Sequence, residues 1–448
     1  MLARSMRQRK RRFDPPFPHG STHTGEKIVL MEERYDANGV DIYAIRNGNL
    51  HSFCLCLYIF AGSMYEKDGE NGISHLYEHA VFSNLVKLTD GRIYRELSLH
   101  GISVNASTYR EFIRFTVSGL PDGFDFALYT LSLILSPFSL SLSDLEGERR
   151  RIKAEIREDD EKNGIEYLLT KAAWDGTPLA NTVSGKWSTV SRISLKKLEE
   201  YRRNNVNKQN SFVCVTGNVS GADIKKLIDT VSKADFGEAT EKRDNAAPVP
   251  SDFLNRNTKI AIKQSSYTYV GISFDIDMTK HGGKTVDIIH SLLFDGDDAV
   301  LFEALSGDDP VIYGFYDTIK ELYKNAGRIF FTFETERKRL YDCLNRITEA
   351  LVKVKRGEYD AMPAVMKEYA SAKTASDDTE MLNWDTAYKG HILSYLTTPE
   401  EYQKIKKEDV TTAAADIFKT QNLTVAVKGD KRKISEDKIK EIFKVLDL

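Results

Sequence analysis

The chain has 448 residues, which is more than one hydrophobic core usually supports, so we expect two or more domains. Hydrophobic residues make up 41% of the chain and charged residues 29%, a balance typical of a globular protein. The formal net charge of -3 argues against nucleic acid or an anionic membrane as the general partner, and the longest apolar run, residues 53–61, is too short to cross a bilayer.

The first 27 residues differ in composition from the rest of the chain. Six basic side chains lie between positions 4 and 12, prolines follow, and no apolar period is present. We interpret residues 1–27 as a disordered basic tail. An organelle presequence, a nucleic-acid contact and a start site placed upstream of Met31 are all compatible with it, and we assign it no function.

From Tyr35 onward the chain alternates predicted strands and helices. The alternating apolar pattern of strands occurs at residues 40–45, 53–60, 102–108, 111–118 and 211–216. The helical period occurs at residues 71–85, 92–100, 123–135, 145–161, 167–173 and 195–204. This order predicts an α+β domain over residues 28–233 with a mostly antiparallel sheet.

The cysteines fall inside this predicted core. They are Cys54, Cys56, Cys214 and Cys343, and no two of them have the CxxC spacing of a metal or redox site. We expect buried free thiols, which suit a reducing compartment, and therefore a cytoplasmic location.

The helix expected at residues 71–85 carries the residues on which the functional prediction depends. His75 and His79 lie one turn apart on one face, about 6 Å from each other at the backbone, so their imidazoles can converge on one ion. Glu78 lies beside them, where a carboxylate can act as general base. This H-x-x-E-H order is the inversion of the more common H-E-x-x-H arrangement of zinc hydrolases.

A catalytic zinc site needs a third protein ligand and leaves its fourth position to water. The best candidate is Glu155, in the helix expected at residues 145–161. Glu148, seven residues earlier on the same helical face, is expected to support the ligands through hydrogen bonds or to be an alternative ligand. Spacing alone does not distinguish Glu155 from Glu148 or Glu158.

With these residues, the sequence resembles the pitrilysin, insulysin and mitochondrial processing peptidase family of inverted zinc metallopeptidases. The resemblance runs from about Glu33 to Gly429, in the short two-domain form. His75-Leu76-Tyr77-Glu78-His79 matches the zinc helix of the family, and Glu155 falls at its third-ligand position. Such a protein would bind one Zn2+ per chain and act as an endopeptidase on peptides or unfolded segments, with Glu78 as general base.

The resemblance also implies where substrate binds. Residues 101–108, GISVNAST, resemble the G-x-x-x-N-A-x-T strand of the family, to which a peptide adds by backbone pairing. Asn105 would clamp the peptide beside Ala106. Phe82, just after the zinc helix, is a candidate for lining a side-chain pocket, with a core position as the alternative.

The second part of the chain repeats the first. A stretch rich in polar and charged residues at 234–258 predicts a linker. Beyond it, over residues 259–448, the strand and helix patterns recur, and residues 422–429 echo residues 210–217 at an offset of 212. We therefore expect two duplicated α+β domains that enclose a clam-like chamber.

The same offset places different residues at the ligand positions of the second copy. They are Asp287, His290, Ser291 and Lys367. This set cannot rebuild the site, so we expect a non-catalytic second half, with His290 packed in the core rather than bound to a metal.

One departure from the family pattern concerns this second half. In the family it usually supplies an Arg and a Tyr, seven residues apart, which contact substrate and the developing oxyanion. Tyr313 is retained here, but Ser306 stands at the Arg position. Losing one such donor removes roughly 3 kcal/mol of transition-state stabilisation.

Ser306 therefore leaves alternatives open. The chain could be one subunit of a two-component peptidase, a homo- or heterodimer with a related chain that supplies the donor, or its activity could be limited to one favoured peptide. It could also be a structural, non-catalytic homologue. A zinc hydrolase acting on another substrate is a further alternative, since a metal site alone does not name its substrate.

Overall fold

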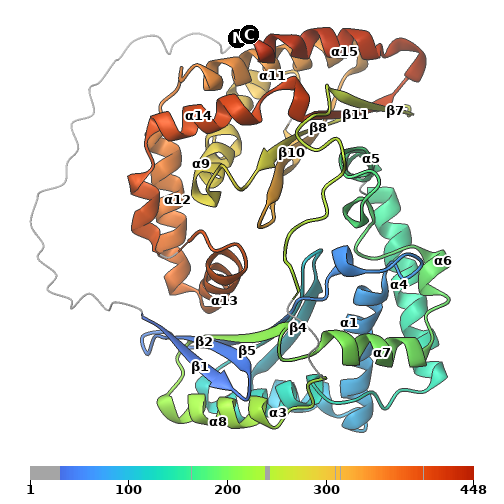
Figure 1. The fold of residues 1–448 in the computed structure, drawn as a ribbon, viewed down its shortest axis with the longest axis vertical. Coiled ribbons are helices and arrows are strands. Elements are labelled where there is room, and N and C mark those ends of the chain that lie inside the picture. The colour runs from blue at the N-terminus through green and yellow to red at the C-terminus, as the bar shows by residue number, and fades with distance from the viewer. Residues whose placement is uncertain (1–30, 163, 238–242, 308, 313, 397) are drawn as a thin grey trace, which may run out of the picture.

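The structure is a computed structural model that describes residues 31–162, 164–237, 243–307, 309–312, 314–396 and 398–448. The basic tail expected at residues 1–27 and the candidate substrate contact Tyr313 lie outside the described residues. The described part forms two halves, each built on one sheet (Figure 1).

The first half contains every strand and helix expected from the sequence, and β1, α6 and α8 in addition. Its strands are β1 (Glu32–Ala37), β2 (Val40–Arg46), β3 (Phe53–Ile59), β4 (Ile102–Thr108), β5 (Ile113–Gly119) and β6 (Ser211–Gly217). Its helices are α1 (Ile73–Leu88), α2 (Ile93–Leu99), α3 (Phe124–Ile134), α4 (Leu142–Lys162), α5 (Gly164–Ala173), α6 (Trp187–Val190), α7 (Leu195–Asn205) and α8 (Gly221–Ser232).

The added strand β1 forms a hairpin with β2. Asn38 and Gly39 join the two strands with φ angles of 57° and 89°, the left-handed conformations that a two-residue hairpin turn requires. Asn-Gly is the pair best suited to both positions, because neither residue is strongly disfavoured there.

The six strands of the first sheet have the order β1-β2-β6-β3-β5-β4. Only the β2–β6 pair is parallel. Every residue of the central strands β3 and β6 is buried, in agreement with the continuous apolar sequence of β3 and of the middle of β6, Phe212–Val215. Strand β4 lies at an edge, next to α1.

The second half repeats this architecture. Its strands are β7 (Lys259–Gln264), β8 (Thr268–Asp277), β9 (Phe315–Leu322), β10 (Ala326–Thr335) and β11 (Leu423–Gly429). Its helices are α9 (Gly283–Phe294), α10 (Val300–Ser306), α11 (Leu340–Lys355), α12 (Met362–Thr374), α13 (Thr379–Trp384), a π-helix (Asp385–Ile392), α14 (Lys407–Ile417) and α15 (Glu436–Phe443).

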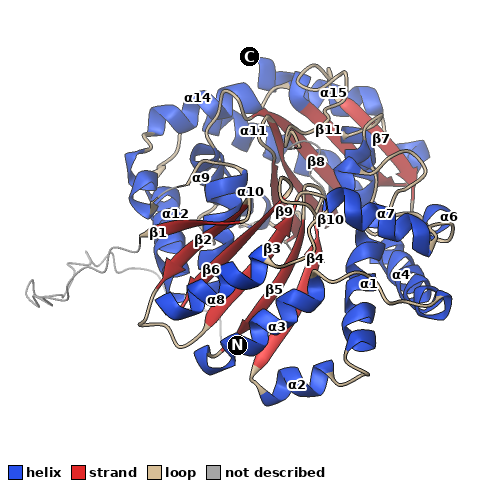
Figure 2. Cartoon of the chain, turned by 60° about the horizontal axis from the view of Figure 1, so that its bottom comes forward, coloured by secondary structure: helices blue, strands red, loops and turns tan. Residues whose placement is uncertain are grey.

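The strand order of the second sheet, β7-β11-β8-β10-β9, matches the order β2-β6-β3-β5-β4 of the first. Its only parallel pair, β7–β11, likewise corresponds to β2–β6. Figure 2 shows the strands of both sheets in red. The fold is thus the duplicated, mostly antiparallel α+β fold that the sequence predicts, and β9 occupies the same edge position as β4.

Each half also covers one face of the other half's sheet. Helix α5 of the first half packs Ile165 and Leu169 against Phe330 and Ala426 of the second sheet. In return, Trp384 and the π-helix pack against the face of the first sheet that carries the buried thiols.

Hydrogen bonds accompany this exchange. The amide of Asn383 on α13 donates to the carbonyls of Cys54 and Cys214, at 3.2 and 2.9 Å, and accepts from the Tyr58 hydroxyl at 3.1 Å. All four cysteines are buried and free, as expected.

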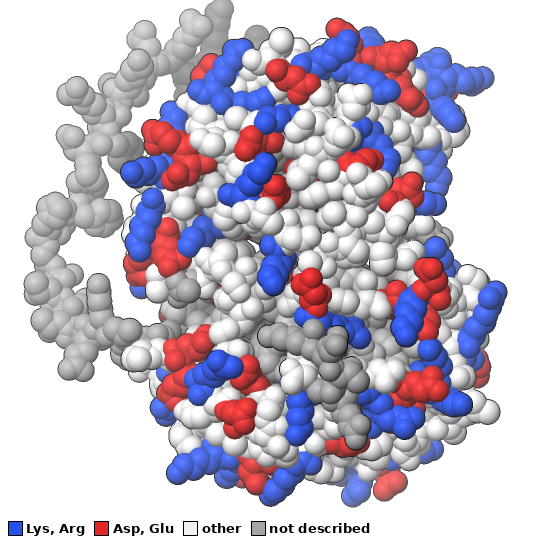
Figure 3. Space-filling view, in the orientation of Figure 1, with Lys and Arg blue, Asp and Glu red and all other residues white. Residues whose placement is uncertain are grey.

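The surface carries both signs of charge. On the face drawn in Figure 3, acidic and basic side chains are interspersed rather than separated into large patches of one sign. None of the helices formed by the described residues is long and apolar enough to span a bilayer.

Candidate metal centre

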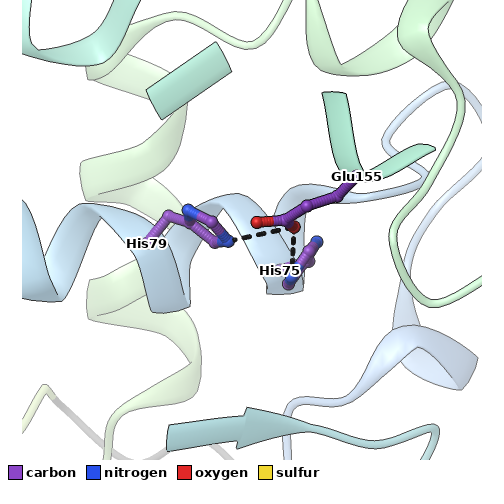
Figure 4. A group of neighbouring side chains, drawn as sticks. All are labelled: His75, His79 and Glu155. Atoms are coloured by element: carbon purple, nitrogen blue, oxygen red, sulfur yellow. Dashed lines mark ion pairs between the residues drawn. The ribbon is translucent and has the colours of Figure 1, made fainter. Parts of the chain in front are cut away.

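Two helices bring three potential metal ligands together. His75 and His79 extend from α1 toward Glu155 on α4 (Figure 4). The Nε2 atoms of His75 and His79 lie 3.5 and 3.4 Å from Oε2 of Glu155. No other group of three His, Cys, Asp or Glu side chains in the described part of the chain is arranged to hold a metal ion.

The separations between these atoms fit a zinc ion. In a tetrahedral site with bonds of about 2.1 Å, neighbouring ligand atoms lie about 3.4 Å apart. Both histidine-to-glutamate distances are close to this value. Two imidazoles and one carboxylate are also a ligand set that catalytic zinc uses, with one position left open.

The surroundings of the two imidazoles differ. Burial, together with the neighbouring His79, lowers the pKa of His75 to about 4, so this ring is neutral at pH 7 and keeps a lone pair for a metal. Burial also acts to lower the pKa of His79. The hydrogen bond with Glu148 and the charges of Glu155 and Glu78 outweigh it, so the pKa of His79 is raised overall.

Glu148 lies behind His79, on the opposite side of the ring from Glu155. Its Oε2 is 3.2 Å from Nδ1 of His79, and its Oε1 accepts hydrogen bonds from Ser83 and Arg151 at 2.6 and 2.7 Å. Burial acts to raise the pKa of Glu148, but these contacts lower it overall. A carboxylate in this position holds Nδ1–H toward itself and leaves Nε2 free to bind a metal.

The side chain of Glu78 extends from α1 toward the edge strand β4. Its Oε2 accepts a hydrogen bond of 2.5 Å from the Thr108 hydroxyl, at the end of β4. Burial raises the pKa of Glu78, although the bond from Thr108 and the charge of His79 oppose the shift. A carboxyl group with a raised pKa is suited to accepting and returning a proton near neutral pH.

The candidate substrate residues lie on and beside β4. Asn105 is exposed on the face of the strand opposite to Val104 and Ala106, which pack against the core, and its Oδ1 accepts from the backbone N–H of Ala106 at 2.9 Å. Phe82 is half-buried and packs against the same core, which corresponds to the alternative expected for it.

The second half uses the equivalent positions differently. Asp287, in the place of His75, pairs with Lys320 at 2.5 Å and accepts from the Tyr402 hydroxyl at 2.6 Å. Lys367, in the place of Glu155, contacts Asp298 at 2.7 Å. His290 lies 2.9 Å from the Thr318 carbonyl, so the role expected for it in packing agrees with its surroundings. In this half, therefore, lysine ammonium groups pair with the carboxylates: Lys320 with Asp287 and Lys367 with Asp298.

Two contacts of the site were not predicted from the sequence: that of Ser83 with Glu148, and that of Thr108, the last residue of the 101–108 segment, with Glu78. Ser83 is four residues beyond His79 on the same helical face, a signal that could have identified it. The contact of Thr108 depends on how β4 packs against α1, which the strand pattern does not reveal.

Ser306, at the end of α10, has a buried hydroxyl without a hydrogen-bond partner among the described residues.

The fold and the site together define a class: a duplicated two-domain α+β protein whose described residues contain one potential metal centre, in the first half. Comparison with known families gives the same result. The profile described as "Insulinase (Peptidase family M16)" matches residues 42–186, and "Peptidase M16 inactive domain" matches residues 192–362. Together the two profiles match more than half of the chain. The chain therefore belongs to the insulinase family of peptidases.

Curated relatives include subunits of mitochondrial assemblies. The chain is 27% identical to cytochrome b-c1 complex subunit 1 of Bos taurus, over 49% of this chain and 46% of that protein. It is 25% identical to the mitochondrial-processing peptidase subunit beta of Dictyostelium discoideum, over 46% of this chain and 44% of that protein. The matches thus span less than half the length of these relatives.

A bacterial relative matches over a longer range. The uncharacterized zinc protease YmxG of Bacillus subtilis (strain 168) is 22% identical, over 73% of this chain and 79% of that protein. Among solved structures, a protease from Helicobacter pylori superposes with a TM-score of 0.79 at 16% identity, covering 89% of this chain and 99% of the other. The periplasmic protease PqqL from Escherichia coli gives 0.73 at 18% identity, covering 93% and 50%. These structural matches concern the fold.

Proposed function

We propose that this protein is a zinc-dependent endopeptidase that hydrolyses peptide bonds in peptides or unfolded segments. The observation that carries the proposal is the placement of His75, His79 and Glu155 at tetrahedral separations beside Glu78. Membership of a peptidase family and similarity to a relative described as a zinc protease support it.

In the proposed reaction three residues hold the metal and a fourth transfers the proton. A zinc ion held by His75, His79 and Glu155 supplies Lewis acidity, which makes water a better nucleophile and the substrate carbonyl more electrophilic. Glu78 accepts the proton of the attacking water and returns it to the leaving amine. No covalent bond to the protein is required.

Strand β4 provides the surface for the peptide. Its edge position leaves backbone groups free to pair with an extended chain. Thr108 ends this strand and contacts Glu78, so a peptide paired with β4 reaches the general base directly. Recognition through backbone groups favours extended or unfolded substrates over one particular sequence.

Ser306 favours a second candidate function, a subunit whose activity depends on a partner chain. The serine hydroxyl is too short to replace a guanidinium as a donor to a developing oxyanion. Relatives named as subunits of a processing peptidase and of the cytochrome b-c1 complex are compatible with a related chain as partner.

Metal content and cleavage test the proposal together. We expect one zinc per chain by elemental analysis, its loss in Glu155→Gln, and retention of zinc in Glu78→Gln with peptide cleavage reduced by about 100-fold or more. A mixed peptide library serves as substrate, with and without a related chain. Zinc binding without cleavage until the related chain is added would establish the second candidate, and absence of zinc from the wild-type protein would refute both.

A further inference from the structure

The ligand-bearing helix α1 begins without a capping side chain of its own. Its N-cap residue is Gly72, which has a φ of 93°. The first backbone N–H groups of a helix have no partner within the helix and must find acceptors elsewhere. In α1 these groups lie directly before His75, so whatever holds them also holds the first metal ligand.

A carboxylate from the preceding loop fills this position. Oε1 of Glu66 accepts from the backbone N–H of Ser74 at 3.0 Å. Oε2 of Glu66 accepts from the backbone N–H of Gly72 at 2.9 Å and from the Asn71 side chain at 3.0 Å. One half-buried carboxylate thus binds three donors within the four residues before His75, at the helix end where negative charge is most favourable.

A second anchor holds Ser74 from the other side. The hydroxyl of Tyr201, on α7, lies 3.0 Å from Oγ of Ser74 and also contacts the Ala61 carbonyl. Both Tyr201 and Ser74 are buried. Gly72 in turn packs so closely on Gly185 that a Cβ on Gly185 would lie 2.4 Å from Cα of Gly72. The start of α1 is therefore fixed on three sides.

The equivalent helix without metal ligands lacks this arrangement. Helix α9 begins at Gly282, a glycine N-cap as in α1, but the N–H groups of Thr285 and Val286 in its first turn bond to the Gly282 carbonyl, and no carboxylate of the described residues accepts from this turn as Glu66 does in α1. The two copies share a fold, so the carboxylate cap is not a general requirement of it. The cap is present in the half where a histidine must be held at a fixed position.

We propose that Glu66 is a positioning residue of the metal centre: its carboxylate fixes the first turn of α1 and thereby the direction of His75. Tyr201 assists through Ser74. This inference rests on the proposed function, because it assumes that His75 binds zinc. Groups hydrogen-bonded directly to a metal ligand typically change metal affinity by about 10- to 100-fold, and we expect Glu66, which acts through the backbone before His75, to lie at the lower end of this range.

Zinc affinity, measured with zinc alone by competition with a chromophoric chelator, tests the proposal on the metal-free full chain. We expect zinc binding to weaken by about tenfold in Glu66→Gln, because an amide cannot accept all three hydrogen bonds. The matched control is Asp223→Asn, which removes a carboxylate cap from α8, where Asp223 accepts from Ser220 N–H and Oγ at 3.0 and 2.6 Å. This control should lower the melting temperature but leave zinc affinity within about twofold of wild type.

Equal zinc affinity in wild type and Glu66→Gln would overturn the inference and leave Glu66 as a structural cap only. If Glu66→Gln does not fold, Tyr201→Phe replaces it, because this change keeps the ring and removes only the hydroxyl. A several-fold loss of zinc affinity in Tyr201→Phe supports the inference, and wild-type affinity refutes it. A wild-type chain that binds no zinc would instead refute the proposed function.

Discussion

Two carboxylates on one helix take opposite sides of the same imidazole. Glu148 and Glu155 are seven residues apart on α4, two turns and about 10 Å along the axis. The ring of His79 lies between them, with Nδ1 toward Glu148 and Nε2 toward Glu155. The same residue type thus supports the ring from one side and offers a ligand atom from the other.

This difference predicts unequal effects of removing the two charges. Glu148→Gln should weaken zinc binding by about tenfold, because the amide still fills the space but attracts Nδ1–H less strongly. Glu155→Gln should abolish binding, since a ligand is lost. Chelator competition at pH 7 measures both, with Glu146→Gln, an exposed position on the same helix, as control. Wild-type affinity in Glu148→Gln would contradict the role assigned to it.

The sequence was informative about residues whose spacing is set within one helix. His75, Glu78 and His79 follow from helical periodicity alone, and the structure shows all three on α1 as expected. Glu66 and Thr108 could not be found in this way. Their contacts depend on how a loop and a strand pack against α1, and that packing is set by residues distant in sequence, such as Tyr201.

At the scale of elements, the second half buries ionisable groups where the first half has its candidate metal ligands. Asp287 on α9, Lys320 on β9 and Glu368 on α12 lie close together, next to Asp385 and Lys389 of the π-helix and near Asp295. Burial raises the pKa of Glu368 from 4.5 to about 7; Lys320 opposes the shift and Asp287 adds to it.

The raised pKa of Glu368 predicts a pH dependence of stability. Between about pH 4.5 and 7 the folded protein holds this proton more tightly than the unfolded chain does, so the free energy of unfolding falls as the pH rises. We expect this group to contribute a decrease of about 1 to 3 kcal/mol across that range. Below about pH 4.5 both states are protonated and the contribution is constant.

Urea unfolding at pH 5 and pH 8 measures this dependence. Glu368→Gln should reduce the difference between the two pH values, because its side chain does not titrate. Glu358→Gln, an exposed position before α12, is the control and should behave as wild type. An unchanged pH dependence in Glu368→Gln would show that another group is responsible.

Strand and helix patterns gave the elements of the first half, but not their partners. The apolar side of α5 indicates that it is buried, and an apolar side packs equally well against any complementary surface. Only the structure shows that Ile165 and Leu169 contact the second sheet. The Asn38-Gly39 turn, in contrast, is a local signal from which β1 could have been predicted.

At the scale of the whole molecule, an ion-pair network that includes a fully buried arginine joins the halves. Glu321 on β9 pairs with Arg110, from the turn between β4 and β5, and with Arg328 on β10, each at 2.6 Å. Arg328 also donates to Thr170 on α5 at 2.9 Å. Burial acts to raise the pKa of Glu321, but the two guanidinium groups lower it to about 2.

Removing this charge should destabilise the entire molecule. Glu321→Gln leaves two arginines facing each other without their shared anion, and we expect the free energy of unfolding to fall by about 3 kcal/mol. Urea denaturation at pH 7 measures the loss. Glu334→Gln, on the neighbouring strand, where the carboxylate accepts a hydrogen bond from the exposed Tyr316 hydroxyl, is the control and should change stability by less than about 0.5 kcal/mol. Equal stability of the two variants would show that the network contributes little.

Length and the repeat at an offset of 212 were sufficient to predict two duplicated domains. Length and repeat were not sufficient to predict that a helix of each half packs on the sheet of the other half. The repeat compares each half with the other and contains no information about contacts across the boundary.

The exchange of α5 and α13 has a consequence for the origin of the chain. The two helices hold equivalent positions in the two copies: α5 follows α4 in the first copy, and α13 follows the equivalent helix α12 in the second. Consider two identical subunits, each with one copy of the fold, that exchanged the helix equivalent to α5 and α13. They would have formed a symmetric dimer in which each subunit covers the other's sheet. Fusion of two such subunits preserves the swap within one polypeptide. It also releases one copy from symmetry, so that residues such as Asp287 and Lys367 can stand at the positions that His75 and Glu155, the candidate ligands, hold in the other copy.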